Sequence, residues 1–137
     1  MSDRVHAAVK AIIEKDGKYL IIEQDIGNRT LWDLPGGRIN YGESPYDSLH
    51  REVLEEVGLV VEVVRCLGMF WFFRDEDRDE VVCTTFLCRI VSGKVDLSQN
   101  PDKDEHIQNY EWVTKEAFLS GAYDGADPSQ KALFELL

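Results

Sequence analysis

The sequence predicts a single α/β domain in which helices cover a mixed β-sheet, and three observations carry this prediction. The chain has 137 residues, of which 44% are hydrophobic and 30% charged, as expected for one globular domain with its own core. Strand-like runs stand before and after one helical segment, residues 45–57, and another helical segment stands near the end. A hairpin turn and a crossover helix both occur, so we expect antiparallel and parallel pairing in one sheet.

The first half of the chain alternates β-favouring apolar runs with turn residues. Asp16-Gly17 lies in a short turn between two such runs, a pattern that predicts a hairpin. A polar loop at residues 24–30 precedes a third, shorter run, which leads into the corner Pro35-Gly36-Gly37. The strands predicted here are residues 5–13, 18–23 and 31–34.

The second half predicts a strand hairpin, one further strand and two helices. The run at residues 60–73 should bend at Gly68, because glycine weakens a strand interior. Thr114 is expected to cap a helix through residue 119, and Asp127 to open a helix that runs to the end of the chain. The remaining segments are a charged turn at 74–80, a strand at 81–91, a loop at 98–105 and a strand at 107–113.

The helix at residues 45–57 has clear start and stop signals. Ser44 is a suitable N-cap, Pro45 suits the first helical position, and Gly58 suits the left-handed residue that ends a helix. An apolar stripe on this helix is expected to pack on the sheet. Its members are Tyr46, Leu49, Val53 and Val57.

Three carboxylates, Glu52, Glu55 and Glu56, occupy the helix edge beside that stripe. Like charges at these spacings repel one another, and a divalent cation would convert the repulsion into binding because hard cations prefer oxygen ligands. The alternative is an ordinary solvated acidic face. The residues that accompany the glutamates favour the metal site.

Composition limits the classes of partner. The net charge of −11 disfavours nonspecific binding of nucleic acid, which depends on phosphate neutralisation by Lys and Arg. Neither a membrane-length apolar run nor a signal-peptide core is found, so we expect a cytoplasmic protein without a membrane partner. The three cysteines indicate neither a disulfide framework nor a zinc ribbon, and Cys83 and Cys88 are expected to be buried.

The residues from Gly37 to Leu59 resemble the signature box of the Nudix hydrolase (MutT-like) family. That box reads G-x5-E-x7-R-E-U-x-E-E-x-G-U with U aliphatic, and every specified position matches. Gly37 and Glu43 open the pattern, and the run from Arg51 to Leu59 completes it. The resemblance implies a Nudix domain over residues 1–137, with its α/β/α sandwich around a mixed sheet.

The resemblance also implies divalent-metal-dependent hydrolysis of a nucleoside diphosphate linked to another group. The expected reaction converts a nucleoside triphosphate to the monophosphate and pyrophosphate, because marks of other subfamilies are missing; some ADP-ribose-cleaving members, for example, carry a proline where this chain has Phe73. Hydrolysis of dinucleoside polyphosphates, ADP-ribose or nucleotide sugars is the alternative within the enzyme class. A nucleotide-binding module without turnover is the alternative outside it.

Position by position, the resemblance implies a site for Mg²⁺ (or Mn²⁺) made by Glu52, Glu55, Glu56 and the Gly37 carbonyl. Arg51 would orient a glutamate of the site, and Glu43 would lie near the metals or brace the loop. The general base varies among family members, and Glu105 is the choice here. Glu52 and Glu55 remain alternative bases.

Substrate contacts are less clearly marked. Arg4 and Arg29 are candidates for phosphate or base contacts, and Phe73 for stacking on a base. Within residues 70–73, strand alternation should turn two of the four aromatic side chains inward. The same apolar strand, if it lies at a sheet edge, would offer a homodimer contact.

Overall fold

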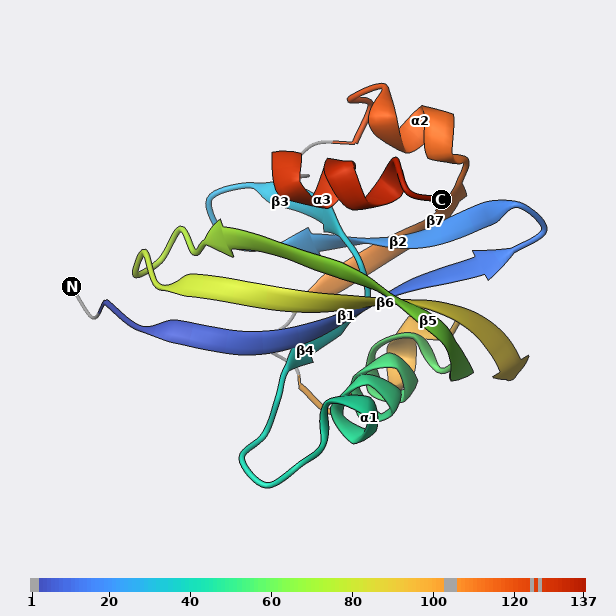
Figure 1. Ribbon diagram of the computed structural model, residues 1–137, viewed down its shortest axis with the longest axis horizontal. Helices are drawn as coiled ribbons and strands as arrows, with labels where there is room; N and C mark the ends of the chain where they lie inside the picture. The colour runs from blue at the N-terminus through green and yellow to red at the C-terminus, as the bar shows by residue number, and fades with distance from the viewer. Residues whose placement is uncertain (1–2, 103–105, 124, 126) are drawn as a thin grey trace.

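The computed structural model describes residues 3–102, 106–123, 125 and 127–137. Its described part forms one seven-stranded sheet with helices on both faces (Figure 1). The main path of the sheet is β3-β2-β1-β6-β5, with β4 paired to β1 and β7 paired to β2. The strands are β1 (Val5–Lys15), β2 (Lys18–Asp25), β3 (Thr30–Asp33), β4 (Gly36–Arg38), β5 (Val60–Phe73), β6 (Glu80–Ser92) and β7 (Ile107–Val113).

The sheet is mixed, as predicted. β1 and β6 run parallel from Val5 opposite Glu80 to Glu14 opposite Arg89. The other strand pairs are antiparallel, including the β1–β2 hairpin around Asp16-Gly17 and the β5–β6 hairpin. β1 therefore lies at the centre of the molecule and contacts β2, β4 and β6.

Helices cover the two faces of this sheet, which confirms the predicted sandwich. Helix α1 (Pro45–Val57) lies on one face, and α2 (Lys115–Leu119) and α3 (Pro128–Phe134) lie on the other (Figure 1). Alternate residues of β1 supply two separate cores, with Val9 on the α1 side and Ile12 on the α3 side. Because strand side chains alternate, one central strand can anchor both layers.

Several element predictions need correction, including the third strand, which spans Thr30–Asp33 instead of residues 31–34. Tyr46 is half exposed instead of buried, although its ring lies 5.4 Å from that of Phe86. The final helix ends at Phe134 instead of continuing to the terminus, and Lys115 Nζ donates hydrogen bonds to the carbonyls of Glu135 and Leu137.

The expected loop at 98–105 begins with a short 3-10 helix, η1 (Leu97–Gln99). β1 and β2 extend two residues beyond their predicted ends.

The aromatic strand β5 behaves as expected. One of the register shifts in its pairing with β6 lies between Cys66 and Gly68, where Gly68 has a φ of +141°. Phe70 is buried, whereas Trp71 and Phe73 are half exposed, so the side chains alternate. β5 ends the main path of the sheet and is thus an edge strand. Cys83 and Cys88 are buried on β6, where burial raises the pKa of each thiol to about 12.

Candidate active site at the glycine corner and helix α1

The corner between β3 and β4 depends on two glycines. A Cβ added to Gly36 would lie 2.0 Å from the Val9 carbonyl oxygen, and the φ of Gly36 is +147°. Glycine is the residue that tolerates both conditions, and it allows β4 to pair tightly with β1. A Cβ on Gly37 would lie 2.6 Å from the Glu52 carboxylate carbon, so the corner and the helix side chain are in direct contact.

Helix α1 presents its glutamates to this corner with capped ends. Ser44 Oγ accepts the Asp47 N–H, and Gly58 closes the helix with a φ of +73°, as predicted. Glu56 is only 2% exposed, and its Oε1 accepts the Gly36 N–H at 2.8 Å. This hydrogen bond joins the helix to the corner.

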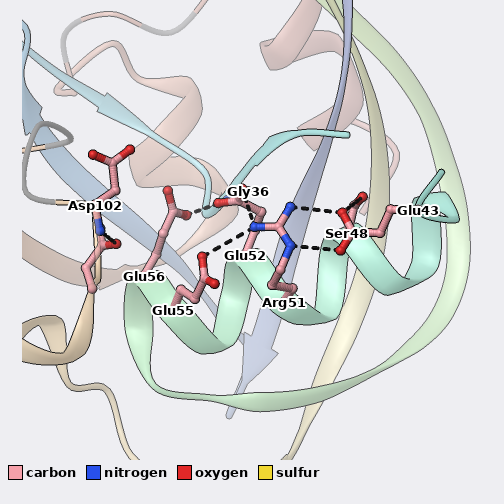
Figure 2. Close-up of polar contacts among 9 residues, drawn as sticks. Gly36, Glu43, Ser48, Arg51, Glu52, Glu55, Glu56 and Asp102 are labelled. Atoms are coloured by element: carbon pink, nitrogen blue, oxygen red, sulfur yellow. Dashed lines mark hydrogen bonds and ion pairs between the residues drawn. The ribbon is translucent and has the colours of Figure 1, made fainter. Parts of the chain in front are cut away.

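Arg51 is the centre of the polar network on α1 (Figure 2). Its guanidinium donates to both Glu43 oxygens, at 2.9 and 3.0 Å, and to Glu52 and Glu55 at 3.0 and 3.3 Å. The Ser48 hydroxyl also donates to Glu43, at 2.6 Å. The hydrogen bonds from Arg51 and Ser48 lower the pKa of Glu43 to about 2, and the same Glu43 contact raises the pKa of Arg51. Charge-assisted bonds of this kind hold the carboxylates in defined positions.

A cleft of about 850 Å³ opens on the α3 side of the corner. Phe70, Phe72 and Phe73 line it, together with Arg29 and Arg78, so it combines aromatic surface with cations. Arg29 is paired with Asp75 at 3.1 Å, and the Arg78 guanidinium lies 5.5 Å from the centre of the Phe73 ring. Arg4 is exposed and is not among the described residues that line the cleft.

Asp33 and Gln130 line the cleft and belong to a buried polar cluster that sequence reasoning missed. Lys10 Nζ donates to Asp33 at 2.9 Å and to the Leu34 carbonyl at 3.2 Å, and Gln130 Nε2 donates to Asp33 at 2.9 Å. Burial opposes the charge on Lys10, but the carboxylate of Asp33 and nearby Cys83 and Glu56 raise its pKa. The one signal in the sequence was a lysine within an apolar strand.

A family model described as the NUDIX domain matches residues 3–137. The chain belongs to the NUDIX domain family. The predicted resemblance is thereby confirmed, and the fold agrees with it.

Individual relatives point the same way. An ADP-ribose pyrophosphatase of Methanocaldococcus jannaschii is 30% identical over 72% of this chain, and the chain spans only 59% of that relative. Phosphatase NudJ of Escherichia coli is 26% identical over 85% of the chain and 73% of its own length. The crystal structure of a MutT protein from Methanosarcina mazei superposes with a TM-score of 0.80 at 28% identity, covering 99% of this chain and 94% of that one. These names agree with the predicted class of enzyme.

Nudix hydrolases generally require a divalent metal, and the donor set of this corner fits one. Three carboxylates and the backbone of Gly37 supply hard oxygen donors, and the missing Cβ of Gly37 leaves room for the Glu52 carboxylate. As arranged in the described residues, no three acidic, histidine or cysteine side chains converge on one point. Glu52 and Glu55 share Arg51 instead, and Glu56 bonds the corner.

The predicted general base, Glu105, lies outside the described residues. The segment before it does come to the site: η1 packs on α1, and Gln99 and Pro101 border a hollow shared with Glu55. Figure 2 shows Asp102, which follows directly, with its carboxylate beyond Glu56 on the C-terminal side of α1. Asp102 is a further acidic candidate from the same loop.

Among the described residues, no helix is long and apolar enough to cross a membrane.

Proposed function

We propose that this chain hydrolyses a phosphoanhydride in a nucleoside diphosphate linked to another group, and that a nucleoside triphosphate, cleaved to the monophosphate and pyrophosphate, is the first substrate to test. One observation carries the proposal. The glutamate edge of α1, held by Arg51, contacts the two-glycine corner, and Asp33 on the strand that leads into the same corner lines the aromatic cleft. Such a juxtaposition suits a substrate with a polyphosphate at one end and a planar base at the other.

Glu52, Glu55, Glu56 and the Gly37 carbonyl would hold Mg²⁺ or Mn²⁺. The ion, when bound, would neutralise the non-bridging oxygens of the phosphoanhydride and favour deprotonation of the attacking water. Arg51 keeps Glu52 and Glu55 in place through its hydrogen bonds, and Glu43 fixes Arg51 in turn. Glu105 stays the predicted base, with Glu52 and Glu55 as the alternatives and Asp102 as an added one.

The cleft would receive the nucleoside. Aromatic side chains on its wall provide stacking surface for a base, and Phe73 is half exposed there. Arg29 stands at the cleft with an exposed ion pair, which a phosphate or ribose group can replace at little cost. Arg4 does not line this cleft, so any phosphate contact that it makes would lie outside the cleft.

ADP-ribose and nucleotide sugars are the second candidate class, and the size of the cleft favours them. At about 850 Å³ it lies in the upper part of the usual range for ligand pockets, about 300–1,000 Å³, so it has room beyond one nucleoside. The relative named ADP-ribose pyrophosphatase supports this candidate too.

The test is release of phosphate and pyrophosphate from a nucleotide panel, with Mg²⁺, with Mn²⁺ and with EDTA. The panel holds the common triphosphates, 8-oxo-dGTP, ADP-ribose, a dinucleoside tetraphosphate and a UDP-sugar. Turnover that needs metal and is confined to one class would establish the substrate. A folded protein that binds metal and nucleotides but turns over none of them would instead be a binding module.

A further inference from the structure

We propose that Gln130 reads an amino group on the nucleobase, so that the cleft prefers a base bearing an exocyclic amine over its amino-free analogue. The inference deepens the proposed function and rests on it for the assumption that a nucleoside enters this cleft. It depends on the orientation of the Gln130 side-chain amide, which is held by a hydrogen bond to Asp33.

Gln130 lies on α3 and is 2% exposed, yet its side chain lines the cleft. Its Nε2 donates to Asp33 Oδ1 at 2.9 Å. A carboxylate oxygen can only accept, so the nitrogen side of the amide must face Asp33. The oxygen of the amide, Oε1, therefore faces away from Asp33.

Asp33 is itself fixed by other donors. The Leu34 N–H donates to the same Oδ1 at 2.7 Å, and Lys10 donates to Oδ2 at 2.9 Å. The Lys10 side chain is 12% exposed and the Asp33 side chain 15%, so the pair is largely shielded from water. Lys10, Asp33 and Gln130 therefore form a chain of hydrogen bonds that holds the amide without help from a ligand.

Oε1 is the end of this chain, and none of the described residues donates a hydrogen bond to it. Within the described part of the molecule, the Gln130 side chain makes no hydrogen bond besides the one to Asp33. No fully buried side-chain polar atom of the described residues lacks a partner, so Oε1 is not fully buried, and the cleft is the hollow that Gln130 lines. A fixed, poorly hydrated acceptor in a ligand cleft selects for a group that donates to it.

On a nucleoside, the donors that suit such an acceptor are the N–H groups of the base. An exocyclic amine would satisfy Oε1, whereas an analogue that lacks the amine and presents no other N–H in its place would displace water and leave Oε1 without a donor. The stacking surface of Phe72 and Phe73 accepts every base and so gives little selection of its own. Discrimination between one base and another should therefore come from Gln130.

The test compares binding of matched nucleoside monophosphates by calorimetry, without metal and without turnover. The pairs are AMP with purine riboside monophosphate, GMP with IMP, and CMP with 2-pyrimidinone riboside monophosphate. For the base that binds best, the amino-bearing member should bind at least about tenfold more tightly. In Gln130→Met, which keeps the length of the side chain, the ratio should fall to about one.

Two further variants separate recognition from folding. Lys131→Met, one position along the same helix, should leave the ratio unchanged. Asp33→Asn should reduce it, because an asparagine amide can donate to Oε1 and release the fixed orientation. The ratio does not depend on the fraction of folded protein, so loss of stability alone would not change it.

Each outcome of these measurements either supports or overturns the inference about Gln130. Equal or tighter binding of the amino-free members, a ratio that survives in Gln130→Met, or no binding of any of the six nucleotides would overturn the inference. Gln130-dependent discrimination without hydrolysis of any panel substrate would support the inference and reject the proposed function. Hydrolysis of nucleotides without Gln130-dependent discrimination would support the proposed function and reject the inference about Gln130.

Discussion

At the scale of single residues, Glu56 combines two roles that a substitution can separate. Its carboxylate accepts the Gly36 N–H and is proposed to bind metal. In Glu56→Gln the amide oxygen can still accept that hydrogen bond, but the negative charge is lost. We expect activity to fall at least about 100-fold, with the melting temperature nearly unchanged.

The matched control for Glu56 is Glu62→Gln. Glu62 lies on β5 and pairs with Arg89 away from the corner, so its loss should leave activity unchanged. Steady-state turnover and thermal unfolding of both variants provide the comparison. Full turnover by Glu56→Gln would remove this residue from the proposed metal site.

Glu43 should make stability depend on pH in the acid range. Its pKa is lowered from 4.5 to about 2 by Arg51 and Ser48, so the unfolded state binds the proton more readily. The stabilisation is then fully present above about pH 4.5 and is lost as pH falls towards 2. Thermal unfolding of the wild type and Glu43→Gln between pH 7 and pH 2 should give curves that differ at neutral pH and converge in acid. Parallel curves would show that this carboxylate does not contribute through its charge.

At the scale of elements, the two corner glycines should respond differently to alanine. In Gly36→Ala the new Cβ would strike the backbone oxygen of Val9 in a conformation that side chains disfavour. We expect a loss of on the order of 2–4 kcal/mol in unfolding free energy, because β1 and β4 must separate.

In Gly37→Ala the nearest atoms belong instead to the Glu52 side chain, which can rotate away. The cost in stability should be about 1 kcal/mol or less, whereas activity should fall at least about tenfold because Glu52 leaves its position. Urea denaturation and turnover measured on both variants test the contrast. Equal losses of stability would show that Glu52 does not rest against Gly37 in solution.

At the scale of the whole molecule, the predicted homodimer concerns the edge strand β5. Met69, Trp71 and Phe73 are each about half exposed there, which makes an apolar row. The Ser129 hydroxyl, however, donates to the Trp71 carbonyl and accepts its N–H, so strand-to-strand pairing is interrupted at this residue. A dimer would have to use the side-chain face of β5 instead of its backbone edge.

Sedimentation tests this prediction. With a net charge of −11, two copies repel one another, so dimerisation should increase as salt screens the charge. Trp71→Glu should prevent it, and Val91→Glu, an exposed position at the far end of β6, should not. A monomeric mass at every salt concentration would reject the homodimer.

Local signals explain why much of the fold could be predicted. The limits of α1 depend on Ser44 and Gly58, whose effects act within one helical turn, and both appear as expected. The β1–β2 hairpin likewise follows from Asp16-Gly17. Tyr46 was misassigned because helical spacing does not reveal how far a helix extends past the sheet that it covers.

The sequence by itself determined the family and the glutamate edge of α1, because both depend on short spacings within one segment. It also determined the mixed sandwich, because the order of strand and helix signals can be followed along the chain. Only the tertiary structure decided which partners those side chains have. Gln130 and Asp33 lie 97 positions apart, and Lys10 lies 23 positions from Asp33, so no local pattern could pair them. The strands and α3 bring these residues into one hydrogen-bonded cluster because burial of apolar surface on both faces of β1 folds distant segments together.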